Sequence, residues 1–327
     1  MSEVDVTEYL APYGTRRVRR PLHLRLTDDT YPLEPRPEES WLPIAFRAFA
    51  RLAERMVVRD VLILGTGNGL DALGAAEIFA LESLAVTDLF EASLSVSRDN
   101  IVAHLADTDG IELSFHTGDL LACVPPERRF CLIYENLPNI PAATPEIQLE
   151  RGINTGRFFD ARELDVPEPF GRYLLALHHR LLSDAREYVR DGGGVLTALG
   201  GRVPHEVAFD LHRACGYRPD LVAFDVKRQV EPDLVIPPYA RAEKENSVDF
   251  TFYAPEAIEL VAEGRRAGLD GQALADAVAP ELVSLAMTAR EAEVHTRRGQ
   301  PVAHSVLMIF GERDASEAVT EYRGPPT

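Results

Sequence analysis

The chain has 327 residues, of which 46% are hydrophobic, which is enough for one large α/β domain with additions or for two domains. Its 34 Lys and Arg residues against 52 Asp and Glu residues give a formal net charge of −18. Such a charge repels phosphate backbones and anionic membranes, so we expect no nucleic acid and no membrane among the partners.

Cysteine usage and the hydrophobic pattern favour a cytoplasmic protein. Cys123, Cys131 and Cys215 show neither pairing nor C-x-x-C spacing, so a disulfide framework or a zinc site has little support. No apolar run reaches the roughly 18 residues of a membrane span, and the acidic N-terminus lacks a signal-peptide pattern. We therefore predict reduced thiols and no metal site.

A proline-rich stretch leads into the first predicted helix. Residues 31–41 read Tyr-Pro-Leu-Glu-Pro-Arg-Pro-Glu-Glu-Ser-Trp, and their three prolines enforce an extended entry. Glu38 and Glu39 suit the first turn of a helix, which we expect over residues 41–55.

A glycine-rich turn follows the first predicted core strand. Residues 61–64 are four consecutive aliphatic side chains, typical of a strand buried on both faces. Gly65, Gly67 and Gly69 then permit positive φ and close approach of a ligand, and the helix that follows attracts anionic groups to its N-terminus. A dinucleotide fingerprint would have its third glycine where Leu70 stands. The G-x-G-x-G spacing instead resembles motif I of the class I S-adenosylmethionine (SAM) methyltransferases. This resemblance favours a nucleotide or SAM site over a nicotinamide site, with a purely structural turn as the alternative.

Acidic residues follow the next two predicted strands. Asp88 comes after a strand over residues 83–87, about 20 residues beyond the glycine loop, where a carboxylate can accept both hydroxyls of a ribose. Asp119 and Leu120 follow a strand over residues 111–116. Because ligands bind at the carboxyl ends of parallel strands, Asp119 is a candidate acceptor for an adenine amine. A turn-forming role is its alternative.

The most specific pattern follows a fourth strand, predicted over residues 130–134. It reads Glu135-Asn136-Leu137-Pro138-Asn139-Ile140-Pro141, and it resembles the N-P-P-Y group of class I SAM-dependent methyltransferases. The resemblance is greatest to the release-factor glutamine methyltransferases, whose signature is F-D-L-I-x-x-N-P-P-Y-I-P. The matching residues are Phe130, Leu132, Ile133, Asn136, Pro138, Ile140 and Pro141.

Further segments resemble the same family. Residues 35–38 are similar to its P-R-P-E-T segment, residues 65–69 to its G-T-G-S-G, and residues 181–216 to its final helix, strand and helix. The resemblance covers about residues 31–217. It implies SAM as the cofactor and an α/β, Rossmann-like class I methyltransferase fold with a mostly parallel seven-stranded sheet.

The chain also departs from the family pattern. The acid usual two residues before the first glycine is Ile63, so one contact to the SAM amino group must come from elsewhere. Leu137 replaces the first proline of N-P-P-Y, and Asn139 replaces its aromatic residue. The Asn136 side-chain oxygen and the Leu137 carbonyl remain as two acceptors able to fix a nitrogen. Glu135 adds a negative charge that suits a cationic or guanidino substrate, and it is the candidate base.

These observations predict a SAM-dependent N-methyltransferase acting on a small polar molecule such as an amino acid, a guanidine or a natural-product intermediate. The alternatives are a protein glutamine N-methyltransferase of release-factor type, a nicotinamide-dependent oxidoreductase and a non-catalytic SAM-binding protein. The predicted catalytic residues are Asn136, Glu135, Leu137 and Pro138. The predicted cofactor-binding residues are Gly65, Thr66, Gly67, Gly69, Asp88, Asp119, Leu120 and Asn136.

The resemblance fades beyond Tyr217. Residues 221–226 and 304–310 are predicted as the last two strands, and the family resemblance implies that the final one runs antiparallel. The predicted division is an N-terminal segment with its lead-in helix (1–56), a SAM-binding core (57–226), an insertion (227–303), and a last strand and tail (304–327). An insertion of this size is usually functional, so we expect a lid or a homodimer interface.

Amphipathic helices are expected within residues 255–293. Their apolar positions need a partner, and they are Ile258, Leu260, Val261, Leu274, Val278, Leu282 and Leu285. Residues 236–239, Ile-Pro-Pro-Tyr, are predicted to form a turn. His178, His179 and His205 have no further potential metal ligands at a suitable spacing in the sequence, so we assign them structural roles.

Overall fold

The computed structural model describes residues 2–26, 33, 36–106, 110–140 and 166–314. Tyr31, Pro35 and Pro141, which belong to the predicted family segments, lie outside the described residues, as does the tail after Asp314. None of the helices in the described ranges is both long enough and apolar enough to cross a bilayer.

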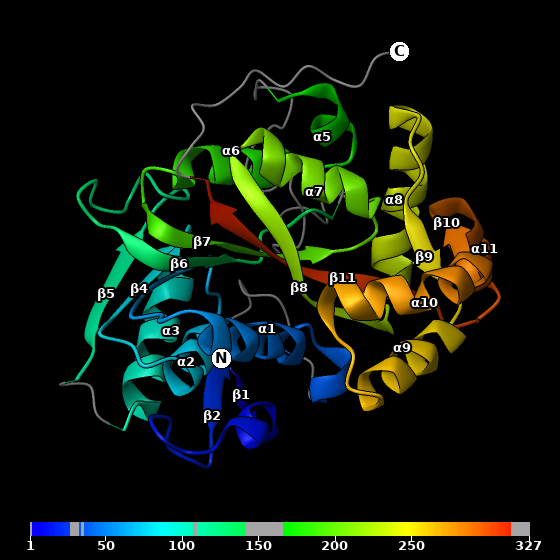
Figure 1. The fold of residues 1–327 in the computed structure, drawn as a ribbon. Helices are drawn as coiled ribbons and strands as arrows, with labels where there is room; N and C mark the ends of the chain where they lie inside the picture. The colour runs from blue at the N-terminus through cyan, green and yellow to red at the C-terminus, as the bar shows by residue number, and fades with distance from the viewer. Residues whose placement is uncertain (1, 27–32, 34–35, 107–109, 141–165, 315–327) are drawn as a thin grey trace.

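The described part of the chain is built on a nine-stranded sheet (Figure 1). Its parallel strands are β3 (Asp60–Leu64), β4 (Ser83–Asp88), β5 (Glu112–Thr117), β6 (Phe130–Glu135) and β7 (Val189–Gly200). The last strand, β11 (Ala303–Arg313), runs antiparallel between β7 and β8 (Tyr217–Arg228). The order β5-β4-β3-β6-β7-β11-β8 confirms the predicted mostly parallel, seven-stranded core with a reversed final strand.

Two short strands explain why the sheet has nine strands where seven are predicted. They are β9 (Thr251–Tyr253) and β10 (Ala286–Thr288), and both come from the insertion. Strand β9 pairs with the start of β11, where Tyr253 lies opposite Ala303. The insertion therefore extends the sheet at the edge where β11 begins.

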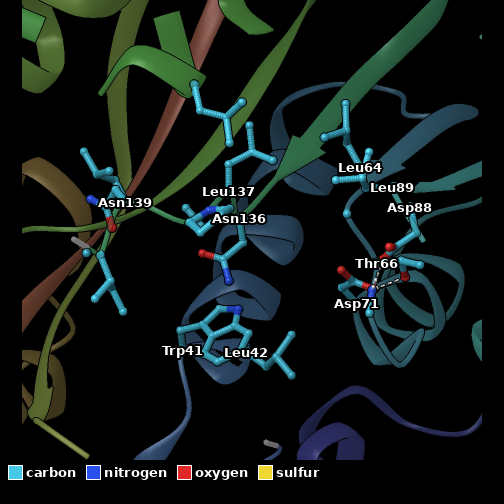
Figure 2. A pocket seen from close by; sticks show the side chains of 18 of the residues that line it. Trp41, Leu42, Leu64, Thr66, Asp71, Asp88, Leu89, Asn136, Leu137 and Asn139 are labelled. Atoms are coloured by element: carbon cyan, nitrogen blue, oxygen red, sulfur yellow. Dashed lines mark hydrogen bonds between the residues drawn. The ribbon is translucent and has the colours of Figure 1, made fainter. Parts of the chain in front are cut away.

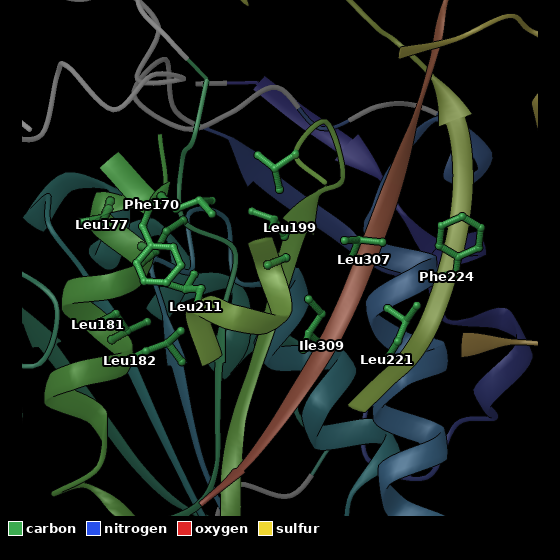
Figure 3. Packing of buried hydrophobic residues seen from close by; sticks show 14 of the residues in the cluster. Phe170, Leu177, Leu181, Leu182, Leu199, Leu211, Leu221, Phe224, Leu307 and Ile309 are labelled. Carbon is green, nitrogen blue, oxygen red and sulfur yellow. The ribbon is translucent and has the colours of Figure 1, made fainter. Parts of the chain in front are cut away.

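The aliphatic runs form strands buried on both faces because helices cover both sides of the sheet. Val61 and Ile63 belong to one hydrophobic cluster, and their neighbours Leu62 and Leu64 to the other. The first cluster packs under α1 (Leu42–Arg55), α2 (Leu70–Ile78) and α3 (Glu91–His104). The second packs under α5 (Glu168–Arg172), α6 (Ala176–Ala185) and α7 (His205–Ala214), as Figure 3 shows.

The N-terminal segment lies beside the helices of the first cluster. It contains an antiparallel pair of strands and two short 3-10 helices: β1 (Ser2–Asp5), η1 (Thr7–Tyr13), β2 (His23–Leu26) and η2 (Pro37–Glu39). The buried Glu77 carboxylate of α2 accepts the backbone N–H groups of Arg16, Arg17 and Val18. Phe46 of α1 lies over Gly74 of α2, where the ring leaves no room for a methyl group. This close packing fixes the start of α1 against the core.

The apolar helical faces of the insertion find their partners within the chain. The insertion contains α8 (Pro232–Asn246), α9 (Glu256–Arg266), α10 (Gly271–Leu285) and α11 (Ala289–Arg297). Helices α9 and α10 pack on each other and on β8, and α11 packs on α8. Val261, Leu274, Val278 and Leu282 are buried, and Ile258, Leu260 and Leu285 pack partly buried against the same cluster. These faces therefore do not require a homodimer partner, because periodicity shows that a face is covered but not which element covers it. A lid or a homodimer interface formed by the insertion stays a prediction. The domain division itself stays a prediction.

The predicted turn at residues 236–239 is also wrong, because these residues lie inside α8. Pro237 and Pro238 each lack the N–H that would bond to the carbonyl four residues earlier. The helix persists because it buries Ile236 and Tyr239 in the second cluster and because the Tyr239 hydroxyl donates to the Asn139 carbonyl at 3.0 Å. Tertiary packing here overrides a local breaker signal.

Candidate active site

A cavity opens at the carboxyl edge of the parallel strands. One half is lined by the glycine loop and by residues that follow β4 and β5: residues 64–68, Asp71, residues 87–90, Ser93 and residues 118–120. The other half is lined by residues that follow β6, β7 and β8 and by the start of β11: residues 136–140, 198–200, Arg202, Lys227, residues 229–230, His304 and Val306. Trp41 and Leu42 lie at the start of α1 below Asn136 (Figure 2).

The glycine loop has the backbone that its sequence predicts. Gly65, Gly67 and Gly69 have φ values of 69°, 58° and 86°, which side chains with a Cβ rarely adopt. Gly65 and Thr66 line the cavity, and their N–H groups donate to the Thr87 carbonyl at 2.9 and 3.1 Å. Gly69 does not line the cavity. It begins α2 against α3, where a Cβ would lie 2.9 Å from Ser97 Oγ, so its place in the structure is close helix packing.

Asp88 lines the cavity and holds the glycine loop to β4. Its two carboxylate oxygens accept the N–H groups of Gly67 and Phe90, each at 3.0 Å. Burial raises the pKa of this carboxyl, while the backbone donors oppose that shift. Each oxygen keeps a second lone pair, so the group can still accept hydroxyls from a ligand.

Asp119 and Leu120 line the same half of the cavity beyond β5. The Asp119 side chain is half exposed, and Arg180 Nη1 lies 2.8 Å from its Oδ2. Leu120 is buried and has a φ of 48°, so the chain turns sharply at this position. The strand order therefore brings Asp88 and Asp119 to one edge, as predicted.

Asp71 is a cavity residue that the sequence reasoning missed. It lies in the first turn of α2, and its Oδ1 accepts the Thr66 hydroxyl and the Ala72 N–H, each at 2.8 Å. Desolvation raises the pKa of this carboxyl to about 7. An acidic residue in a first helical turn usually interacts favourably with the helix dipole. Because the sequence position of Asp71 fits this common role, the sequence gives no sign that its side chain lines the cavity. Ile63, where the family acid would stand, is buried in the core.

Asn136 lies in the middle of the cavity wall, between the two halves. The groups around the carboxamide assign its orientation: the oxygen is placed to accept the Trp41 indole N–H at 2.9 Å, and the nitrogen to donate to the Ala198 carbonyl at 3.2 Å, with O and N exchanged relative to Figure 2. The oxygen has a second lone pair for a ligand. Trp41 was not predicted to be part of the site. The signal available in the sequence is that the only tryptophan of the chain follows the proline-rich segment directly.

Leu137 and Pro138 line the cavity beside Asn136, but Glu135 does not. Glu135 is fully buried, with His178 Nδ1 2.9 Å from its Oε1 and the Leu137 N–H donating to its Oε2 at 2.8 Å. The predicted role of Glu135 as a base or as a charge facing the substrate is therefore corrected. Consecutive residues at the end of a strand point in opposite directions, so Asn136 lines the cavity while Glu135 points toward α6.

Three basic side chains also line the half of the cavity farthest from the glycine loop, and the sequence reasoning did not include them. Arg202 follows β7, Lys227 is near the end of β8, and His304 is near the start of β11. All three are at least 93% buried. The predicted topology could have indicated His304, because an antiparallel last strand begins at the edge of the sheet where the parallel strands end.

The mostly parallel sheet with its reversed last strand is the fold of class I SAM-dependent methyltransferases, which use SAM as the cofactor. Comparison with known proteins agrees, although no family model matches the chain. It is 31% identical over 205 residues to the release factor glutamine methyltransferase of Deinococcus radiodurans and 26% identical over 186 residues to that of Koribacter versatilis. The chain thus resembles the release factor glutamine methyltransferases.

The extent of these matches is partial. They cover 61% and 54% of this chain and 66% and 59% of the relatives, so under two thirds of each relative is matched. Among solved structures, the ribosomal protein L11 methylase of Lactobacillus delbrueckii subsp. bulgaricus is 18% identical, with a TM-score of 0.35, over 54% of this chain and 69% of that one.

The prediction of a small-molecule substrate is wrong. The relatives are named for methylation of a glutamine in a release factor, which is a protein. The argument for a small cationic substrate depended on Glu135 facing the cavity, and the structure buries this side chain. The coarser part of the prediction, a SAM-dependent N-methyltransferase, agrees with the relatives.

We expect Asp88→Asn to weaken binding of the by-product S-adenosylhomocysteine (SAH) by about tenfold or more. An asparagine amide would place its NH₂ against one of the two backbone N–H donors, and it would lose a charge-assisted acceptor for the ribose. Isothermal titration calorimetry measures the change. Asp119→Asn is the matched control, with a smaller effect because Asp119 is half exposed and screened by solvent. Equal losses in the two variants would contradict the role given to Asp88.

Proposed function

We propose that this chain transfers the methyl group of SAM to the side-chain amide nitrogen of a glutamine in a protein substrate. The observation that carries the proposal is the Asn136 turn, which lines the cavity and matches the N-P-P-Y position in a chain similar to release factor glutamine methyltransferases. An amide nitrogen has two N–H groups to be held. The Asn136 oxygen and the Leu137 carbonyl are two acceptors suited to them.

The burial of Glu135 favours an amide over an amine or a guanidine. An amine or guanidine arrives protonated at neutral pH and needs a base within reach of its nitrogen, whereas an amide is neutral and needs none before attack. Among the described residues that line the cavity, the carboxylates are Asp71, Asp88 and Asp119. All three lie in the half lined by the glycine loop, which we call the cofactor half. The half beyond Asn136 is lined by neutral and basic side chains instead.

The cofactor half is suited to SAM. Asp88 would accept the ribose hydroxyls and Asp119 the adenine amine, while Gly65 and Gly67 leave room for the ligand beside the loop. Asp71 would supply the acidic contact to the SAM amino group that Ile63 cannot make. SAM brings an activated methyl group, so the protein has to position the acceptor nitrogen and exclude water rather than provide a nucleophile.

The test is a methylation assay with the full-length chain, SAM and a peptide that carries the release-factor-type glutamine. We expect SAH to form and the peptide to gain one methyl group on the glutamine amide, located by tandem mass spectrometry. The same peptide with glutamate in place of the glutamine is the control, since it lacks the amide nitrogen. Methylation of the control, or SAH release that depends only on free amino acids or guanidines, would refute the proposal.

A further inference from the structure

The half of the cavity beyond Asn136 is lined by three basic side chains, of which Arg202 and Lys227 are cations. Arg202 is 4%, Lys227 7% and His304 5% exposed. Lys227 and His304 lie directly opposite each other on the paired strands β8 and β11, so their side chains share one face of the sheet. Burial lowers the pKa of His304, and the nearby positive charges of Arg202 and Lys227 lower it further. The three side chains therefore form one cluster.

Arg202 is held in place by neutral groups. Its Nη2 donates to Gln229 Oε1 at 2.7 Å, and its guanidinium carbon lies 5.3 Å from the ring centre of Tyr239 and 5.8 Å from that of Phe252. Its Nε is buried without a hydrogen-bond partner, and so is His304 Nδ1. Among the residues that the structure describes, no carboxylate lies within ion-pair distance of Arg202. Burying a cation without a counter-charge is costly, so this arrangement is suited to an anion that arrives with a ligand.

The position of the cluster separates it from the cofactor. Strands β11 and β8 lie three and four positions from β3 in the sheet, roughly 14–19 Å at the usual strand spacing. The acids Asp71, Asp88 and Asp119 line the opposite half. The Asn139 carbonyl, which accepts from the Tyr239 hydroxyl, connects the Asn136 turn to the aromatic ring beside Arg202. A group bound by the cluster would thus lie on the substrate side of Asn136.

We propose that Arg202, Lys227 and His304 form an anion subsite that binds a carboxylate of the protein substrate, from an acidic residue near the glutamine to be methylated. This inference rests on the proposed function and names a substrate preference for the same site. The planar guanidinium matches a carboxylate through two parallel N–H donors, and Lys227 adds a point charge. An acidic peptide can form a desolvated ion pair with these side chains and a neutral peptide cannot, so the subsite would select the acidic peptide.

The test compares peptides that share the glutamine and differ only in having glutamate or glutamine at positions scanned along both flanks. Wild-type protein should methylate at least one glutamate-containing peptide with a kcat/KM about tenfold above that of its neutral partner, the effect of one hydrogen bond to a charged group. Lys227→Gln should remove most of this preference. Lys244→Gln, which removes the same charge from an exposed position of α8, is the matched control and should keep it.

Each other result has a defined meaning. Equal kcat/KM values for acidic and neutral peptides at every position would overturn the inference while leaving the proposed function intact. A loss of SAH affinity in Lys227→Gln equal to its loss of preference would assign the cluster to the cofactor, which also overturns it. If no peptide is methylated, the proposed function fails.

Calorimetry with glutarate and its neutral analogue glutaramide then tests the subsite alone. Glutarate binding should then exceed glutaramide binding and fall about tenfold in Lys227→Gln. Equal binding of the two probes would refute the subsite.

Discussion

Asn136→Ala is expected to lower kcat by roughly 100-fold while SAH binds with nearly unchanged affinity. The substitution removes an acceptor whose direction is fixed on both sides, by the Trp41 indole N–H and by the Ala198 carbonyl. A small misplacement of a reacting nitrogen costs about this factor, because methyl transfer depends on alignment more than on any chemical group of the protein. Steady-state kinetics with the glutamine peptide, together with calorimetry for SAH, separates the two effects.

Trp41→Phe is the matched variant for this prediction. It keeps an aromatic ring at the start of α1 but removes the indole N–H that orients the Asn136 oxygen. We expect an intermediate fall in kcat, about tenfold, as for the loss of one buried hydrogen bond. If Asn136→Ala retained full activity, the amide clamp would be excluded. If Trp41→Phe were as impaired as Asn136→Ala, the indole itself would have to contact the substrate.

The elements that local pattern determines were predictable from the sequence. Four aliphatic residues followed by three alternate glycines are typical of a buried strand and a tight turn, and β3 with its loop is built in this way. The position of Asp88 beside the glycine loop was also predictable, because neighbouring parallel strands end at the same edge of the sheet. The antiparallel final strand was predicted from the family resemblance and not from residue pattern, since nothing in residues 304–310 specifies a direction.

The errors arise where neighbours in sequence are not neighbours in space. Glu135 precedes Asn136 directly, yet the alternation of side chains at the end of β6 sends it into the core. Trp41 and Asn136 are far apart in the chain and meet only when α1 packs against the sheet. Lys227 and His304, which are far apart in the chain, lie opposite each other through the register of β8 and β11. The residues of the substrate half were therefore less predictable than those of the cofactor half.

Glu135→Leu is expected to lower the free energy of unfolding by about 3 kcal/mol or more. Leucine can accept no hydrogen bond, so His178 Nδ1 and the Leu137 N–H would lose the partners they have at 2.9 and 2.8 Å inside the core. Each buried donor left without an acceptor costs about 1–3 kcal/mol. Urea denaturation of wild type and variant measures the difference, provided that both unfold in one cooperative transition.

The double variant Glu135→Leu with His178→Leu separates a positioning role for Glu135 from a catalytic one. Removing both polar partners of a buried pair costs less than removing one, so the second substitution should recover part of the lost stability, and the coupling energy of the cycle should be large. The Leu137 N–H would still lack its acceptor, so the turn that carries Asn136 should stay displaced and activity should not recover with stability. A Glu135→Leu protein that is as stable as wild type but inactive would instead require the carboxylate to face the substrate. That result would restore Glu135 as the base and would favour a protonated nitrogen over an amide as the methyl acceptor.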